Sequence, residues 1–252
     1  NIITADISGI GVIVAKQDLV VAGLQIAEKV FKALEPTARL AGSVKDGDRV
    51  GPGATVATIQ GSLRTLLKGE RTALNFMQRL SGIATQTRAF VEAVSDAPVK
   101  LVDTRKTTPG GRVLEKYAVR VGGGGNHRMG LYDGVLIKDN HIAVAGGILQ
   151  AVQQVRHAIS HLVKVEVETT SFAEVREALE AGADIIMLDN MGLDQILQAV
   201  KIIDKRALIE VSGGVTRDRL KDLARSGVDL ISIGALTHSA VAVDLSMRIT
   251  KT

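Results

Sequence analysis

Cationic and hydroxyl side chains gather in one short, glycine-punctuated part of the chain. Residues 103–112 read DTRKTTPGGR, and residues 122–130 read GGGGNHRMG. Over residues 105–138, seven Lys or Arg and two acidic residues give a net charge of +5, whereas the whole 252-residue chain carries +4. Arginine can hold a carboxylate or phosphate through two parallel hydrogen bonds, and lysine adds a point charge. This region therefore predicts a binding site for a small anion.

The surroundings of each cation separate the binding candidates from ordinary helix surface. Lys116 and Arg120 are four residues apart in the helical pattern RVLEKYAVR, so we expect both to be solvated on a helix surface. The other candidates follow strand-like runs or glycine turns, where a side chain can reach a ligand. These candidates are Arg105, Lys106, His127, Arg128 and Lys138.

Three carboxylates follow in the next two apolar runs. Glu166 and Glu168 belong to VEVET, and Asp189 belongs to MLDN. Carboxylate oxygens suit Mg²⁺, which keeps several waters and reaches the phosphates of a substrate, and they can also bind sugar hydroxyls. An ion pair with Lys138 or Lys164 would explain any one of the three carboxylates. The set as a whole favours a functional role.

Glycines and hydroxyl groups close the last two apolar runs. The first of these runs continues into VSGGV at residues 211–215, and the second contains ISIGALTHS at residues 231–239. In α/β barrels, backbone amides at adjacent strand ends frequently hold a phosphate. Ser212, Gly213 and Gly234 are therefore candidates for a phosphate site, and tight turns are the alternative explanation.

Composition excludes several other classes of function. The chain has no cysteine, which removes disulfides, thiolate metal sites and a cysteine nucleophile. Aromatic residues make up 2% of it, which argues against the stacking platforms that bind single-stranded nucleic acid. No apolar run approaches the ~18 residues of a membrane span, and no signal-peptide pattern opens the chain. We expect a cytoplasmic protein that acts on small molecules and binds neither nucleic acid nor membranes.

After Pro98 the chain alternates between short apolar runs and helical segments. The six runs, each ending in polar or glycine residues, are VKLVDTRK, GVLIKDN, VKVEVET, DIIMLDN, ALIEVSGG and DLISIGA. Alternating strands and helices predict a parallel sheet with right-handed crossovers. Because ligands bind at the carboxyl ends of such strands, the candidate side chains should meet along that rim.

One of these runs favours a barrel over a doubly wound sheet. In VKVEVET the three valines of VKVEV share one face, whereas Lys164, Glu166 and Glu168 share the other. A strand between two helix layers should be apolar on both faces, so the charged face needs a lumen that contains ligand or partner charges. Six clear strands are too few for a regular eight-stranded barrel. We expect an incomplete or compact barrel.

The first hundred residues show a different pattern. Residues 11–23 predict short strands, and LQIAEKVFKAL predicts a helix. Residues 43–61 alternate apolar positions around Asp-Gly and Pro-Gly turns, as a small β unit does. Helical spacing then continues over residues 66–96 and is interrupted near Ser81 and Gly82, which leaves either one long helix or two consecutive helices.

Several of these motifs together resemble one family. GERTALNFMQRLSGIAT, DTRKTTPGGR, KYAVRVGGGGNHRMGLYDGVLIKDNH, VEVET, MLDN, VSGGV and GVDLISIGALTHS are similar to segments of quinolinate phosphoribosyltransferases, the carboxylating nicotinate-nucleotide pyrophosphorylases of NAD biosynthesis. The resemblance extends over nearly the whole chain in the right order. The DTRKTTPG block and the block from NHR to IKDNH are its most specific parts.

The resemblance implies a fold, a reaction and an assembly. It implies an α/β protein with an N-terminal α/β sandwich domain, placed at residues 1–98, and a C-terminal open α/β barrel of about seven strands at residues 99–252. The tail from about residue 239 is expected to pack back on the first domain. The implied reaction uses Mg²⁺ and converts quinolinate and phosphoribosyl pyrophosphate to nicotinate mononucleotide, pyrophosphate and CO₂. The implied assembly is a homodimer or higher oligomer with active sites shared between subunits.

The resemblance also assigns roles to the candidate residues. The carboxylates of quinolinate fall to Arg105, His127, Arg128 and Lys138, together with Arg71 of GERTALN from the neighbouring subunit. For phosphoribosyl pyrophosphate, Lys106 and Lys138 meet phosphate oxygens, Glu166 and Asp189 bind ribose hydroxyls and the metal, partly through water, and Ser212, Gly213 and Gly234 cradle the 5′-phosphate. Glu168 is the alternative to Glu166. The residues expected to act in the reaction are Lys106, Lys138, Glu166 and Asp189.

Two other functions compete with this hypothesis. One is a related enzyme of the same fold with another substrate, such as the homologue associated with molybdenum transport. The second is a non-catalytic sensor of a phosphate metabolite, although the carboxylates would then have no purpose. Formation of nicotinate mononucleotide from quinolinate distinguishes all three.

Overall fold

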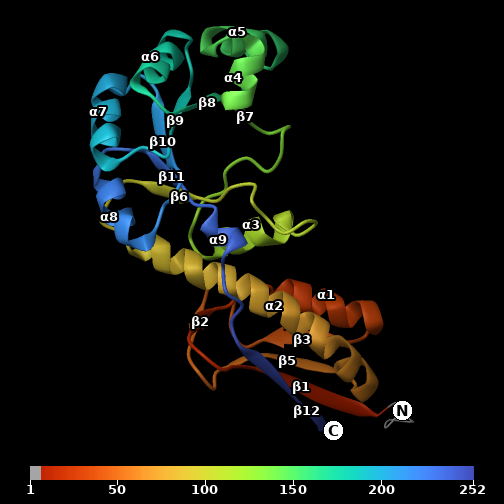
Figure 1. Cartoon of the computed structure of the whole chain (residues 1–252). Helices are drawn as coiled ribbons and strands as arrows, with labels where there is room; N and C mark the ends of the chain where they lie inside the picture. The colour runs from red at the N-terminus through yellow and green to blue at the C-terminus, as the bar shows by residue number, and fades with distance from the viewer. Residues whose placement is uncertain (1–6) are drawn as a thin grey trace. The chain divides into compact units, whose positions relative to one another are not determined.

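The computed structural model describes residues 7–252, so residues 1–6 of the predicted N-terminal domain lie outside the described residues (Figure 1). The chain forms two compact units. The first combines residues 7–89 with 108–123 and 235–252, and the second combines residues 90–107 with 124–234. Each unit therefore contains segments that are distant in sequence. The domain ranges derived from the sequence stay predictions.

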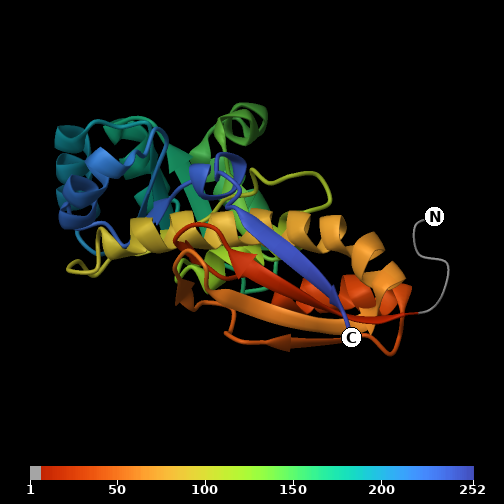
Figure 2. The same ribbon diagram turned by 90° about the horizontal axis from the view of Figure 1, so that it is seen from below.

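An antiparallel sheet is the framework of the first unit, with its strands in the order β12-β1-β5-β3. Their bounds are Leu245–Lys251, Ser8–Ala15, Thr55–Ser62 and Arg39–Gly42. β12 pairs with β1 over its full length, so strands from opposite ends of the chain lie side by side (Figure 2). Two short strands, β2 (Leu19–Val20) and β4 (Arg49–Val50), form a separate antiparallel pair.

Two helices cover this sheet. α1 is Leu24–Leu34, as the sequence predicts, and α2 is one uninterrupted helix, Leu63–Glu92. The break suggested near Ser81 and Gly82 is absent because both residues are buried and used for packing. The Ser81 hydroxyl accepts a hydrogen bond from the Ala22 amide at 2.9 Å. A Cβ on Gly82 would lie 2.1 Å from the carbonyl oxygen of Val241.

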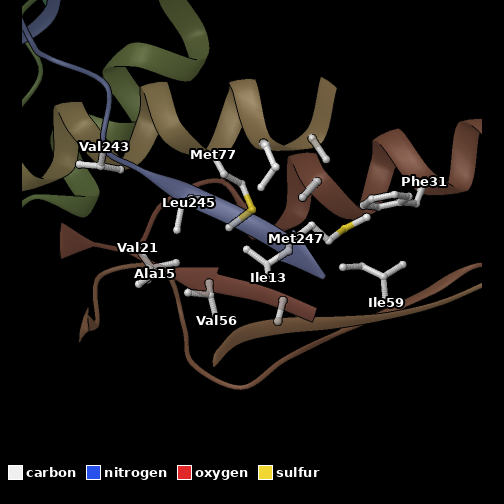
Figure 3. Close-up of a cluster of buried hydrophobic side chains, with 14 of the residues drawn as sticks. Ile13, Ala15, Val21, Phe31, Val56, Ile59, Met77, Val243, Leu245 and Met247 are labelled. Carbon is white, nitrogen blue, oxygen red and sulfur yellow. The ribbon is translucent and has the colours of Figure 1, made fainter. Parts of the chain in front are cut away.

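The core of the first unit lies between the sheet and these helices (Figure 3). Phe31 of α1 and Met77 of α2 face Ile13, Ile59 and Met247 of the strands, and all five side chains are buried. Each such burial contributes about 1.5–3 kcal/mol to folding. Because aromatic residues are scarce, aliphatic and methionine side chains make up most of this core.

Helix α3 (Arg112–Val121) also belongs to the first unit and corrects one expectation. Arg120 is exposed, as predicted, but Lys116 is fully buried rather than solvated on the helix surface. Its neighbour Glu115 is 3% exposed and accepts hydrogen bonds from the Arg79 guanidinium at 2.9 and 3.1 Å. The charged residues of RVLEKYAVR therefore include an inward-facing polar cluster. Their charges in the sequence look the same as those of a solvated helix surface, so charge alone could not distinguish the two. The one-turn helix α9 (Ala235–His238) leads into the C-terminal strand.

The second unit is a six-stranded parallel sheet in the order β6-β11-β10-β9-β8-β7. Each of the six apolar runs forms one strand; in the order of the sheet these are Lys100–Val102, Leu230–Ser232, Leu208–Ser212, Ile185–Asp189, Val165–Thr169 and Val135–Ile137. The resemblance implies about seven strands. Among the described residues the seventh position is taken only by a single parallel bridge between Val102 and Gly125.

Helices cover one face of this sheet (Figure 1). They are α4 (Asp139–Ala145), α5 (Ile148–Ala158), α6 (Phe172–Glu180), α7 (Leu193–Ile203) and α8 (Arg217–Arg225). α6, α7 and α8 each bury apolar residues three positions apart, such as Val175 and Ala178 of α6, as amphipathic helices do. Within residues 7–252, none of the helices combines the length and the apolar character needed to span a bilayer.

Candidate active site

Strand register places the predicted rim residues on one face of the second unit's sheet. Residues paired in a parallel ladder point to the same side, and residues two apart along a strand share that side. Leu136 pairs with Glu166, Glu168 pairs with Met187, and Ser212 pairs with Asp189. The shared face therefore carries Lys138, Glu166, Glu168, Asp189 and Ser212. The opposite face is lined by the fully buried Val165 and Val167 and their neighbours, against the helices.

The strand β8 shows why its sequence alternates. It begins at Val165, so Lys164 lies before the strand and is exposed rather than sharing the charged face. Glu166 and Glu168 do share that face, and each has a polar partner: Glu166 contacts His127, and Glu168 forms an ion pair with Lys138. Lys138 thus compensates the charge of Glu168 inside the unit, whereas Glu166 has an imidazole as its partner.

Three predicted cations line one cavity. The cavity has a volume of about 700 Å³ and lies beside β7, α4 and α5. Arg105, Arg128 and Lys138 contribute its positive charge, and Leu131 and Leu136 contribute apolar surface. A cavity of similar volume, about 720 Å³, lies in the first unit, but it contains none of the predicted site residues. The cavity beside β7 combines two arginines with an apolar surface on which a flat ring can rest.

Two cations of this cavity, Arg105 and Arg128, repel each other. Burial lowers the pKa of Arg128, and the charge of Arg105 lowers it further, whereas Glu166 and Asp133 act in the opposite direction. The Arg128 guanidinium is held in place by a hydrogen bond to the Gly134 carbonyl oxygen at 3.1 Å. An anion that enters the cavity therefore meets two arginines whose mutual repulsion it relieves.

His127 is fixed at both ring nitrogens. The backbone amide of Arg128 donates to Nδ1 at 2.8 Å, and Nε2 lies 3.0 Å from Oε2 of Glu166. Because an amide can only donate, Nδ1 must be the unprotonated nitrogen, and Nε2 then carries the proton and donates to Glu166. His127 thus links the loop that contains Arg128 to Glu166 of β8.

Glu210, on β10, completes this cluster and was not among the predicted residues. It is 1% exposed, and its Oε1 lies 3.6 Å from Nε2 of His127. Burial, and then the charge of Glu166, raises the pKa of Glu210 to about 7. The segment LIEVS alternates as VEVET does, and Glu210 stands in it two residues before Ser212. The sequence therefore contained a signal for Glu210.

The geometry of this cluster is that of a hydrogen-bonded group. His127, Glu166 and Glu210 present ligand atoms within 4.8 Å of one another. A metal-bound histidine nitrogen needs a lone pair, and the other ring nitrogen must then donate its proton. Here Nδ1 faces a donor, so Nε2 cannot offer a lone pair. The Oε1 atoms of Glu166 and Glu210 are both buried and have no hydrogen-bond partner among the described residues.

Asp103 is a second residue that sequence reasoning missed. It is fully buried at the end of β6, where its carboxylate accepts hydrogen bonds from the Asn126 side chain at 2.6 Å and from the His127 amide at 2.9 Å. It therefore holds the start of the NHR segment. A lone aspartate ahead of five cationic or hydroxyl residues gave no sign that it is buried.

The remaining predicted residues are placed as follows. Lys106 is exposed three residues after Asp103, and its amide donates to the Thr104 hydroxyl at 3.1 Å. Gly213 and Gly214 follow β10 with φ of 87° and 57°, a left-handed turn that favours glycine. Gly234 lies two residues beyond β11. Arg71 belongs to the first unit, where it is exposed on α2, and its role in a neighbouring subunit's site stays a prediction.

Comparison with known families gives two matches that together extend over most of the chain. Residues 83–248 match the model of the quinolinate phosphoribosyl transferase C-terminal domain. Residues 2–81 match the model of the N-terminal domain of the same family.

Individual relatives agree with this assignment. A probable nicotinate-nucleotide pyrophosphorylase (carboxylating) of Bacillus subtilis is 48% identical over 238 residues, which are 94% of this chain and 82% of the relative. A quinolinate phosphoribosyltransferase (decarboxylating) of Nicotiana tabacum is 42% identical over 253 residues, 93% of this chain and 72% of the relative. The crystal structure of NadC from Streptococcus pyogenes superposes with a TM-score of 0.95 at 45% identity, covering 100% of this chain and 89% of that one. The chain belongs to the quinolinate phosphoribosyltransferase family.

Proposed function

We propose that the carboxyl-terminal edge of the six-stranded sheet is where this chain carries out the reaction of its family. The chain is a phosphoribosyltransferase that converts quinolinate and phosphoribosyl pyrophosphate to nicotinate mononucleotide, pyrophosphate and CO₂. The geometry of the second unit suggests the roles of individual residues in that reaction and the position of the metal.

The observation that carries the site assignment is the cavity lined by Arg105, Arg128 and Lys138. Quinolinate is a flat pyridine with two adjacent carboxylates, so it needs cations on one side and apolar contact on its ring. Arginine forks suit carboxylates, and the repulsion between Arg105 and Arg128 falls when a dianion binds between them. We assign the quinolinate carboxylates to these three residues. His127 acts by positioning Arg128, because both of its ring nitrogens are already engaged.

Phosphoribosyl pyrophosphate is assigned to the neighbouring strand ends. The 5′-phosphate would lie at the turn after Ser212, where Gly213 and Gly214 bring the backbone close, and beside Gly234. The ribose hydroxyls would face Asp189 and a glutamate of β8. Lys138, at the end of β7, lies between the cationic cavity and Glu168, so it can meet phosphate oxygens of the second substrate as well. Lys106 is the other candidate for the pyrophosphate oxygens.

The donor set at this edge suits Mg²⁺. Glu168 and Asp189 lie near the ends of adjacent strands on the same face, and both offer hard oxygen ligands. Glu166 lies two residues deeper and is engaged with His127, so the geometry favours Glu168 over Glu166 as the partner of Asp189. When bound, Mg²⁺ would neutralise charge on the pyrophosphate leaving group.

Catalysis then follows from fixed charges. As the bond between C1 of the ribose and pyrophosphate breaks, positive charge builds on the sugar, and the carboxylates of Asp189 and Glu168 stabilise it. The quinolinate nitrogen forms the new bond to C1. The resulting pyridinium accepts the electron pair left by the departing carboxylate, CO₂ leaves, and a proton takes its place on the ring. No nucleophile from the enzyme is needed, and the cations hold the second carboxylate throughout.

Two further features are proposed from the sequence. We infer a homodimer or larger assembly in which Arg71 of a neighbouring chain completes each site, because Arg71 is exposed on α2 and lies in the GERTALN motif. The cytoplasmic location also stays a prediction.

The site assignment is tested by replacing one cavity arginine. Arg105→Ala should raise the quinolinate KM about tenfold to a hundredfold, because a charge-assisted hydrogen bond to a carboxylate is lost. The KM of phosphoribosyl pyrophosphate and the circular dichroism spectrum should stay unchanged. Arg120→Ala, which removes an exposed arginine from α3 outside the cavity, is the matched control and should leave both constants unchanged. Near-normal quinolinate kinetics in Arg105→Ala would refute the assignment.

A further inference from the structure

We propose that Asn190 is a positioning residue that fixes the carboxylate of Asp189 against the turn formed by Ser212 and Gly213. It would thereby set the distance between the ribose and phosphate parts of the phosphoribosyl site. The inference rests on the proposed function, since that function assigns ligands to Asp189 and to the turn. Asn190 itself is given no contact with substrate.

The backbone of Asn190 is unusual for its place in the fold. Its φ is 55°, in the left-handed region, and it directly follows the last residue of β9. Among the described residues the other non-glycine residues with positive φ are Asp204 and Lys205, at the carboxyl end of α7, where this conformation commonly ends a helix. Asn190 ends no helix. A left-handed residue costs about 1 kcal/mol, although asparagine tolerates it best among side chains.

The side chain of Asn190 accounts for the choice of asparagine. Its Nδ2 donates a hydrogen bond to Oδ2 of Asp189 at 2.7 Å, which holds that carboxylate in one orientation. Glycine would adopt the same φ without strain, but it would supply no donor. The position therefore keeps a strained residue where an unstrained one would fit, and strain of this kind is expected at functional sites.

The same residue contacts the turn on the neighbouring strand. The backbone amide of Asn190 donates a hydrogen bond to the carbonyl oxygen of Ser212 at 3.0 Å. A Cβ on Gly213 would lie 2.2 Å from Oδ1 of Asn190, so the side-chain amide lies directly against the backbone of that glycine. Asn190 thus joins a carboxylate at the end of β9 to the turn at the end of β10 through three separate contacts.

The consequence is a fixed spacing between two ligand positions. With Oδ2 of Asp189 held by Asn190, the other carboxylate oxygen is the one directed at a ribose hydroxyl or a cation. The turn that would hold the 5′-phosphate cannot shift without displacing the same asparagine. Loss of the side-chain amide should therefore weaken binding of phosphoribosyl pyrophosphate and leave quinolinate binding unaltered, since the cationic cavity lies elsewhere on the sheet.

The test compares two glycine substitutions by isothermal titration calorimetry with phosphoribosyl pyrophosphate. Asn190→Gly removes the side-chain amide and relieves the backbone strain. It should lower the affinity for phosphoribosyl pyrophosphate about tenfold or more, both with Mg²⁺ and with a chelator present. The melting temperature of Asn190→Gly should stay close to that of the wild type, which excludes a folding defect as the cause of weaker binding. Asp204→Gly makes the same change of backbone at the end of α7, outside the site, and should leave the affinity unchanged.

Kinetics separate this role from a merely structural one. Asn190→Gly should raise the KM of phosphoribosyl pyrophosphate and lower kcat, whereas the quinolinate KM stays at the wild-type value. Wild-type affinity in Asn190→Gly would overturn the inference while leaving the proposed function intact. If the wild-type chain itself does not bind phosphoribosyl pyrophosphate, the proposed function fails and the inference fails with it.

Discussion

At the scale of single residues, the site holds like charges close together. Their repulsion is unfavourable as long as no ligand or proton compensates it. Arg105 and Arg128 repel each other beside a cavity, and Glu166 and Glu210 do the same beneath His127. Such arrangements persist only when the surrounding structure holds them, and they cluster at functional sites. The arginine pair is relieved by a dianionic ligand, whereas the glutamate pair is relieved by a proton.

The glutamate pair makes stability depend on pH. The pKa of Glu210 is raised from 4.5 to about 7, so between these values the folded chain keeps a proton that the unfolded chain has lost. The free energy of unfolding contributed by this group therefore falls as pH rises from about 4.5 to about 7 and is constant above. Relative to Glu210→Gln, which cannot ionise, the wild type should lose up to about 3 kcal/mol over this range.

Urea unfolding of both chains at pH 5, 6, 7 and 8 measures this difference. Titrating groups that do not interact with Glu210 are the same in the two chains and cancel in the comparison. Glu166 and His127 do interact with it, so the difference reports the cluster of these three side chains. A wild-type minus variant difference that stays constant across these values of pH would show that Glu210 does not hold a proton in the folded state.

The sequence identified the cationic side chains of the site more readily than the buried acids that hold them in place. Arg105, Arg128 and Lys138 were found because they follow strand-like runs or glycine turns, and the structure brings them to one cavity. Asp103 was missed because it is a single acid whose burial depends on segments far away in sequence, whereas the alternation of LIEVS did contain a signal for Glu210 that was not used. Lys116 was misplaced for the same reason, since helical spacing shows which residues share a face but not which face is inward.

At the scale of elements, the pattern of the sequence was more informative. All six apolar runs after Pro98 became strands of one parallel sheet, because alternation and glycine turns are local signals. The order of the strands and the one-residue bridge at Gly125 depend on long-range pairing and could not be derived from composition. α2 is continuous where the pattern suggested a break, because Ser81 and Gly82 contact other segments of the first unit.

Gly82 provides a test of that packing. Alanine normally stabilises a helix interior by about 1 kcal/mol relative to glycine. At this position a Cβ would meet the carbonyl oxygen of Val241 at 2.1 Å, and a backbone atom cannot move aside easily. Gly82→Ala should therefore lower the free energy of unfolding by about 1–3 kcal/mol in urea titrations.

The control for Gly82→Ala is Thr72→Ala, on an exposed position of the same helix. It should leave stability unchanged or raise it by a few tenths of a kcal/mol. If Gly82→Ala were as stable as this control, the close contact with Val241 would be refuted.

At the scale of the whole molecule, the inferred sharing of sites between subunits can be tested by complementation. Arg71→Ala and Lys138→Ala should each be nearly inactive alone, because every site then lacks one of the two residues. After the two variants are mixed and their subunits exchanged, random pairing gives heterodimers with one intact site, and about a quarter of wild-type activity should return.

The matched control mixes Arg105→Ala with Lys138→Ala. Both residues line the cavity of a single chain, so no combination of these subunits restores a complete site. Recovery in the first mixture and none in the second supports shared sites. Absence of recovery in both, with subunit exchange verified by native mass spectrometry, would contradict them.

The reaction itself is the most direct test of the central claim that the cationic cavity binds a pyridine dicarboxylate. The purified chain is incubated with phosphoribosyl pyrophosphate, Mg²⁺ and quinolinate labelled in its 2-carboxylate, and nicotinate mononucleotide and labelled CO₂ are measured together. We predict that the two products form in equal amounts and that nicotinate in place of quinolinate gives no turnover. Mononucleotide formed from nicotinate, with quinolinate left unused, would contradict the account.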